Sequence, residues 1–179
     1  EQCGKRRITD GLLVIDDSLA HKSGKHIEGA NWFWDHTKHA HTFGHQLVTS
    51  QWVGKIFHVP LHYRLYRKEE DVPQEAFQSK LDLAIQLIEE AMVSEIPFSC
   101  VAADSWYFCD KIIKYLASIC KDWVFASKSN RKICVKGLWM SLREFAKTLK
   151  KEDFKQVQIT KTKYIFSGID RVKLYTGLR

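Results

Sequence analysis

Continuous apolar runs along the first two-thirds of the chain predict the central strands of a sheet. Residues 11–16 read GLLVID, an apolar run ending in acid that is typical of a strand buried on both faces. Residues 98–103 form a second run of this kind, followed directly by Asp104. A shorter apolar run over residues 123–126 predicts a third strand.

The segment between the first two apolar runs begins with a polar stretch and continues with apolar ones. Residues 18–44 are dotted with glycine and rich in His and Lys, which predicts a long loop or a loose hairpin. Residues 45–53 and 55–66 are rich in β-branched and aromatic side chains and flank Gly54. That arrangement predicts a β-hairpin.

Helical spacing of apolar residues predicts three helices. Asp71 has the pattern of an N-cap and Gln74 that of its capping-box partner, so we expect the first helix to begin there and to end before Pro97. Two further helices are expected over residues 109–120 and 142–149. The stripe that carries the first helix consists of Phe77, Leu81, Ala84, Ile85, Ile88 and Met92.

The order of these elements predicts an α/β fold with a mixed sheet flanked by helices. The character changes toward the C-terminal end, where short strands with exposed lysines are expected over residues 157–160, 163–166 and 172–175. We therefore expect two regions, residues 1–132 as a core and residues 133–179 as a smaller basic region.

Composition excludes several classes of protein. The chain has 179 residues, 45% of them hydrophobic, which excludes a disordered segment. No apolar run is long enough for a membrane span, and we expect no membrane partner. The five cysteines form no CxxC pair, which argues against a zinc ribbon and a disulfide framework and favours a reducing, cytoplasmic location.

Charge is divided unevenly along the chain. Residues 1–104 carry 11 Lys and Arg against 15 Asp and Glu, whereas residues 105–179 carry 17 against 6. A folded domain with this asymmetry favours an anionic partner on one face, with nucleic acid the leading candidate. A solvated basic surface that maintains solubility is the alternative.

Carboxylates at the ends of two apolar strands are the main candidates for chemistry. Asp16 and Asp17 end the first strand, and Asp104 follows the second. The carboxyl ends of parallel strands meet at one edge of a sheet, where ligand sites lie. Converging carboxylates suit Mg²⁺ or Mn²⁺, and two such ions can promote phosphoryl transfer. The alternative for Asp104 is an N-cap of the following helix.

Two further groups in the polar region could contact nucleic acid. Lys22 and Lys25, beside the first carboxylates, either bind a phosphate or are simply solvated. Trp32, Phe33 and Trp34 either stack on unpaired bases or anchor the segment to the core.

Several segments, taken in order, resemble insertion-sequence transposases, the bacterial and archaeal DDE enzymes whose catalytic core has a ribonuclease-H-like fold. The resemblance covers roughly residues 10–150. The segments are LLVIDDS, KSGKHIEGA, HQLVTSQWV, SKLDLAIQLIEEAM and PFSCVAADSWY.

The resemblance implies roles for particular residues. It implies Asp104 as the second catalytic acid and metal ligand, and either Asp17 or Asp16 as the first. An acid pair before Ser favours Asp17, which we prefer, whereas an Asp-x-Ser pattern favours Asp16. A basic turn that contacts DNA corresponds to Lys128, Arg131 and Lys132.

The implied activity is Mg²⁺-dependent (or Mn²⁺-dependent) cleavage of double-stranded DNA at transposon ends, followed by strand transfer to target DNA. The resemblance also implies two bound metal ions in the intact enzyme and a homodimer when DNA is bound. It further implies a location at the nucleoid of a prokaryotic cell. The implied fold is a ribonuclease-H-like mixed sheet flanked by helices, interrupted after residue 132 by a basic β-rich insertion.

One family feature has no counterpart in the chain. The third metal ligand of the family is a Glu in a Tyr-Arg-Glu-Lys type signature, and the glutamates after Asp104 are Glu144 and Glu152, inside the expected insertion. We therefore expect a catalytic domain that is incomplete at both ends. The alternatives are a catalytically silent DNA-binding remnant and another ribonuclease-H-like nuclease.

Overall fold

The computed structural model describes residues 11–24, 26–56 and 58–150, together with the backbone of three short strands. The chain divides into two compact units, Glu1–Ala126 and Ser127–Arg179. Each unit is described by itself.

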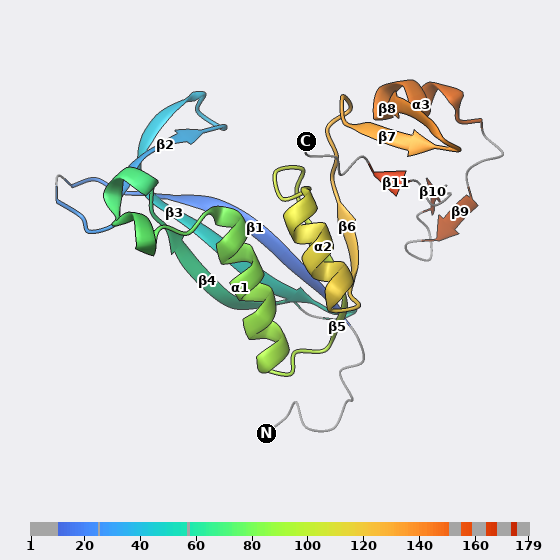
Figure 1. Cartoon of the computed structure of the whole chain (residues 1–179). Helices are drawn as coiled ribbons and strands as arrows, with labels where there is room; N and C mark the ends of the chain where they lie inside the picture. Colours follow the sequence, from blue (N-terminus) through green and yellow to red (C-terminus); the bar gives the residue numbers. More distant parts are fainter. Residues whose placement is uncertain are drawn as a thin grey trace. The chain divides into compact units, whose positions relative to one another are not determined.

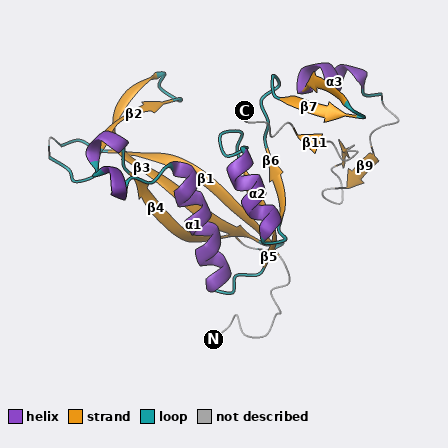
Figure 2. Ribbon diagram, viewed as in Figure 1, coloured by secondary structure: helices purple, strands orange, loops and turns teal. Residues whose placement is uncertain are grey.

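The first unit is built on a mixed six-stranded sheet (Figures 1 and 2). Its strand order is β2-β3-β1-β5-β6, and β4 also pairs with β3. β1 pairs in parallel with β5 and antiparallel with β3, and β5 pairs in parallel with β6. The strands are β1 (Gly11–His21), β2 (Asn31–Asp35), β3 (Ala40–Val53), β4 (His58–Tyr66), β5 (Phe98–Ala103) and β6 (Asp122–Phe125).

The polar region over residues 18–44 is largely strand. β1 continues through His21, well past the predicted end at Asp16. β2 and the start of β3 form a hairpin in which Asn31 pairs with Gly44 and Asp35 with Ala40. The hairpin alternative is therefore confirmed, and so is the hairpin predicted around Gly54, which joins β3 to β4.

Two helices follow the predicted order, but the first begins later than predicted. α1 (Lys80–Val93) begins at the N-cap Ser79, which forms a capping box with Asp82. The predicted start at Asp71 was wrong, because two short 3₁₀ turns, η2 (Glu69–Asp71) and η3 (Gln74–Ala76), occupy that segment. α2 (Asp110–Ser118) lies within the predicted range.

Both helices pack on the same face of the sheet. Leu13 and Ile15 of β1 are almost fully buried against them, and Leu12 and Val14, which point to the other face, are half-buried. The predicted burial of β1 on both faces is thus complete on one face only. The helices contribute Leu83, Ala84, Leu87, Ile88, Ala91, Ile112 and Leu116 to the core.

The second unit is small. β7 (Lys132–Val135) pairs with β8 (Leu138–Ser141) and β11 (Lys173–Leu174), and β9 (Lys155–Gln158) pairs with β10 (Tyr164–Ser167). α3 (Leu142–Thr148) confirms the predicted helix, and the three predicted C-terminal strands overlap β9, β10 and β11 with shifted bounds. Parts of those predicted strands lie outside the described residues. The role of this unit as an insertion stays a prediction.

Candidate active site

Asp16 and Asp104 occupy corresponding positions on neighbouring parallel strands. The parallel register of β1 and β5 ends with Ile15 opposite Ala103, and the next residue along each strand is an aspartate. β1 continues beyond this point paired with β3 alone, so Asp16 is its first residue past the end of β5. The expected meeting of carboxylates at this edge of the sheet is therefore present, although β1 itself does not end there.

Asp17 points to the opposite face of the sheet. Side chains alternate along a strand, so Asp17 shares the helix-covered face with Leu13 and Ile15, and Asp16 points to the other face. One oxygen of Asp17, Oδ2, accepts hydrogen bonds from Lys80 Nζ at 2.7 Å and from Gln46 Nε2 at 2.5 Å. The hydroxyl of Tyr107 donates to Oδ1 at 3.4 Å. Asp17 is thus held within the packing between sheet and helices.

The electrostatics of Asp16 reflect its neighbours. Burial raises the pKa of its carboxyl, and the negative charges of Asp17 and Asp104 raise it further, against a lowering by the backbone N–H of Asp17. Burial also raises the pKa of the Tyr107 hydroxyl, with further contributions from Asp17, Asp16 and Asp104. The negative charges of Asp17 and Asp104 therefore act on Asp16, and the Tyr107 hydroxyl stays protonated.

The local geometry at Asp104 differs from that of a helix cap. Its Oδ1 accepts the backbone N–H of Trp106 at 2.8 Å, a turn characteristic of aspartate after a strand. α2 begins at Asp110, with Cys109 as its N-cap, so the alternative of Asp104 as a helix cap was wrong. The side chain of Asp104 is exposed, and its hydrogen bond closes the turn that follows β5.

The donor set at this edge fits a hard divalent cation. Mg²⁺ is commonly held by one or two carboxylates, with waters and substrate phosphates completing its shell, and Asp16 and Asp104 supply two carboxylates. The raised pKa of Asp16 marks a place where uncompensated negative charge is unfavourable, which a cation relieves. Within the described part of the chain, no group of three or more His, Cys, Asp or Glu side chains is arranged to hold a metal ion.

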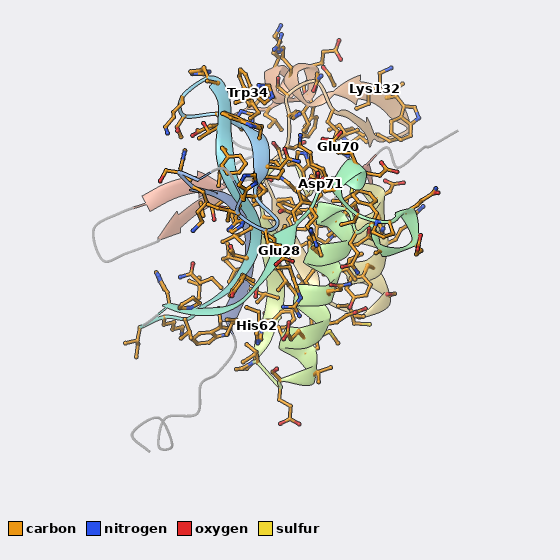
Figure 3. All side chains as sticks on the ribbon, turned by 90° about the vertical axis from the view of Figure 1, so that its left-hand side faces the viewer. Glu28, Trp34, His62, Glu70, Asp71 and Lys132 are labelled. Atoms are coloured by element: carbon orange, nitrogen blue, oxygen red, sulfur yellow. The ribbon has the colours of Figure 1, made fainter. Side chains whose placement is uncertain are left out.

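The predicted phosphate-binding residues fall in different places. Lys22 follows β1, and its backbone N–H donates to the carbonyl of Phe43 at 3.0 Å, whereas Lys25 lies outside the described residues. Lys128 and Arg131 of the second unit form a turn closed by the bond from the Arg131 N–H to the Lys128 carbonyl, 3.0 Å long. Lys132 begins β7 and is exposed (Figure 3).

Lys80 and Tyr107 are the residues near the site that sequence reasoning missed. Lys80, the first residue of α1, also lies over the rings of Tyr66 and Trp106, with Nζ 5.5 and 5.4 Å from their centroids. Tyr107 lies in the PFSCVAADSWY segment that carries the family resemblance, but no feature of its own marked it as a neighbour of the carboxylates. Nothing in the sequence marked Lys80 as a site residue. The helix was predicted to begin at Asp71, so Lys80 was expected in the middle of the helix and not at its first position, where it contacts Asp17.

Comparison with known proteins identifies the family. No curated protein and no solved structure gives a significant match. Separately, none of the described helices is long and apolar enough to cross a membrane. A family model described as DDE superfamily endonuclease matches residues 2–138, more than half of the chain. The mixed sheet with helices agrees with the ribonuclease-H-like fold expected of such a domain. The chain therefore belongs to the DDE superfamily endonucleases.

Proposed function

We propose that this chain is the catalytic core of a DNA transposase that cleaves DNA at transposon ends and transfers the freed strand to target DNA. Membership of an endonuclease family implies DNA as the substrate. The observation that carries the proposal is the parallel register of β1 and β5, which ends immediately before Asp16 and Asp104.

The proposed roles of the acids follow from their surroundings. Asp16 and Asp104 would hold Mg²⁺ or Mn²⁺, and Asp17 would keep β1 attached to α1 through Lys80. This reverses the preference for Asp17 that the sequence suggested, because the Asp17 oxygens already bind Lys80, Gln46 and Tyr107. A bound divalent cation would supply positive charge to stabilise the phosphoryl-transfer transition state.

The chain's own groups orient the acids. The Trp106 N–H fixes one oxygen of Asp104, and the Thr49 hydroxyl donates to the Asp16 carbonyl at 3.1 Å, which holds β1 against β3. DNA would reach the acids from the face opposite α1 and α2, because Asp16 points to that face. A homodimer on DNA, with the basic turn of Lys128, Arg131 and Lys132 contacting phosphates, belongs to the same proposal.

The gain in stability when a divalent metal ion binds tests whether Asp16 and Asp104 are metal ligands, and it requires no catalytic turnover. Mn²⁺ or Mg²⁺ at about ten times its Kd should stabilise the chain by about 1.4 kcal/mol in thermal unfolding. Asp16→Asn and Asp104→Asn should abolish this response, and Asp17→Asn, the matched control, should keep it. Loss of the response in Asp17→Asn and Asp104→Asn, with Asp16→Asn unaffected, would make Asp17 the first acid. A response unchanged in all three variants would remove the proposal.

A second candidate is a DNA-binding protein without cleavage activity. It is favoured by the finding that no third carboxylate joins Asp16 and Asp104 among the described residues. Under this alternative, Asp16→Asn and Asp104→Asn leave both DNA affinity and metal response unchanged.

A further inference from the structure

The hairpin of β2 and β3 presents two tryptophans to solvent. Trp32 is 57% exposed and Trp34 is 46% exposed, whereas Phe33 between them is 8% exposed. Phe33 packs on Tyr66 with ring centroids 6.0 Å apart, so it anchors the hairpin to the rest of the unit. Anchoring therefore accounts for Phe33 but not for the two exposed tryptophans.

The exposed tryptophans belong to an ordered set of rings. Trp32 lies against Phe43 with centroids 5.7 Å apart, and Trp34 lies against His41 at 5.3 Å and against His36 at 6.5 Å. These five side chains form what we call the aromatic cluster (Trp34 is labelled in Figure 3). Strand pairing of Trp32 with Phe43 and of Trp34 with His41 holds the rings in place before any ligand binds.

The aromatic cluster lies on the same face of the sheet as Asp16. Paired residues share a face, and positions 41, 43, 45, 47 and 49 of β3 alternate onto one side. Phe43 pairs with Trp32, and Thr49 pairs with Asp16. Thr49 lies six positions after Phe43, which is ~20 Å along a strand, about the length of six stacked nucleotides.

The hairpin that carries the cluster is itself poor in acids, although Glu69 and Glu70 line the hollow that Trp34 and His36 also line. Lys22 lies beside Phe43 through its backbone hydrogen bond, and Lys38 lies in the turn that joins the two strands. Residues 31–45 contain a single carboxylate, Asp35, which is 6% exposed and accepts hydrogen bonds from Thr37. A nucleic acid strand could therefore approach the rings without meeting an exposed acid of this hairpin.

We propose that the aromatic cluster stacks on unpaired bases of the DNA strand that runs to the carboxylate edge. The inference rests on the proposed function, which it extends by naming single-stranded DNA as the ligand of this hairpin. Bases within a duplex already stack on one another, whereas an unpaired base offers a free face to Trp32 or Trp34. A strand so held enters the site at a fixed distance from Asp16.

Conservative and non-conservative replacements of the tryptophans test the proposal with the full chain. Trp32→Leu/Trp34→Leu keeps apolar surface but removes the rings, and Trp32→Phe/Trp34→Phe keeps a ring for stacking. The Leu variant should bind a single-stranded oligonucleotide about 5- to 150-fold more weakly per stacked base. Its affinity for duplex of the same sequence should stay within about twofold of that of the original chain. The Phe variant should retain most of the single-strand affinity.

Tryptophan fluorescence provides a measurement that does not depend on the variants folding. Single-stranded DNA should quench the fluorescence of the original chain more strongly than duplex does. Single-strand affinity unchanged in the Leu variant, or equal losses on single strand and duplex, would overturn the proposal, as would absence of quenching. An unaltered affinity would leave the tryptophans as an apolar surface for a protein partner.

The two proposals fail in distinguishable ways. The metal response of Asp16→Asn and Asp104→Asn reports on the carboxylate edge and does not involve the tryptophans. Single-strand binding by the aromatic cluster is measured without metal. Loss of stacking with an intact metal response overturns only this inference, and the reverse result overturns only the assignment of Asp16 and Asp104.

Discussion

The ammonium group of Lys80 lies 2.7 Å from the carboxylate of Asp17, joining the first residue of α1 to the middle of β1. About one-fifth of each side chain is exposed, so solvent weakens the pair without removing it. Asp17 lies on the helix-covered face, and the alternation of side chains along β1 turns its neighbour Asp16 to the opposite face, next to Asp104 in the strand register. The adjacent aspartates thus have separate structural surroundings.

Removing the charge of Asp17 should destabilise the fold. Asp17→Asn leaves Lys80 without its anionic partner, and we expect a loss of about 1–3 kcal/mol in the free energy of unfolding. Lys80→Met should have a similar effect. The double variant should lose less than the sum of the two, with a coupling energy of about 0.5–3 kcal/mol in urea denaturation. Strict additivity would show that the pair contributes nothing to stability.

The sequence alone could locate the carboxylates but not tell Asp16 from Asp17. Alternation along β1 can be counted, but Leu12, Leu13, Val14 and Ile15 are all apolar, so no residue type marks the face that the helices cover. Only the packing of α1 and α2 on Leu13 and Ile15 shows which of the two aspartates shares the helix-covered face. Trp32, Phe33 and Trp34 could not be told apart from sequence for the same reason. All three are aromatic, so residue type does not show which of them faces the core.

The start of α1 escaped prediction for a related reason. Asp71 and Ser79 both precede a polar residue at the third following position, so both fit a capping box. Tertiary contacts favour Ser79, because its partner Asp82 also binds Lys111 of α2. The long apolar runs of β1 and β5 and the stripe of α1 were predictable, since burial fixes residue type there over many positions.

Asp82 should make the fold sensitive to acid. Hydrogen bonding to Lys111, and then to Ser79, lowers the pKa of Asp82 from its ordinary value of 3.8. Because the pKa of Asp82 is lower in the folded state than in the unfolded state, the ionised carboxylate stabilises the fold when the pH is above 3.8. This contribution is lost as the pH falls from 3.8 toward the folded-state pKa. Asp82→Asn should reduce stability at neutral pH and flatten this part of the acid dependence, measured by thermal unfolding between about pH 5 and pH 2.

The matched control for Asp82 is Glu95→Gln, an exposed acid just past the end of α1. It removes one negative charge from an exposed position and should leave the stability at neutral pH unchanged. Equal slopes for Asp82→Asn and the original chain would contradict the assignment of this contribution to Asp82.

Gly44 should not tolerate a side chain. A Cβ at this position would lie 2.4 Å from the Ala20 carbonyl oxygen, a backbone atom held in the pairing of β1 with β3. Gly44→Ala should therefore cost about 1–3 kcal/mol in unfolding free energy. Gly24→Ala is the control, because its Cβ would meet only the flexible end of Ile27 at 3.1 Å. Equal stability of the two variants would contradict the close approach at Gly44.

The basic turn of the second unit should contribute to DNA affinity through phosphates. Lys128→Ala and Lys132→Ala should each weaken binding to unrelated duplexes to the same extent and reduce the salt dependence of log K by about 0.9 per lost contact. Lys147→Ala, an exposed lysine of α3, is a control with the same change in charge. If all three variants shift the slope equally, the effect belongs to net charge and not to the turn.

Strand transfer by the 179-residue chain should be weak, because two carboxylates hold a pair of divalent ions poorly and no third one joins Asp16 and Asp104 among the described residues. The measurement is joining of a pre-cleaved transposon end to plasmid DNA in Mg²⁺ and in Mn²⁺, with the Asp16→Asn/Asp104→Asn double variant as background. Joining should stay within about tenfold of that background, a difference of ~1.4 kcal/mol in activation free energy. Robust Mg²⁺-dependent joining would mean that a third metal ligand exists within the chain. Cleavage of an RNA–DNA hybrid in preference to transposon ends would instead indicate a different ribonuclease-H-like nuclease.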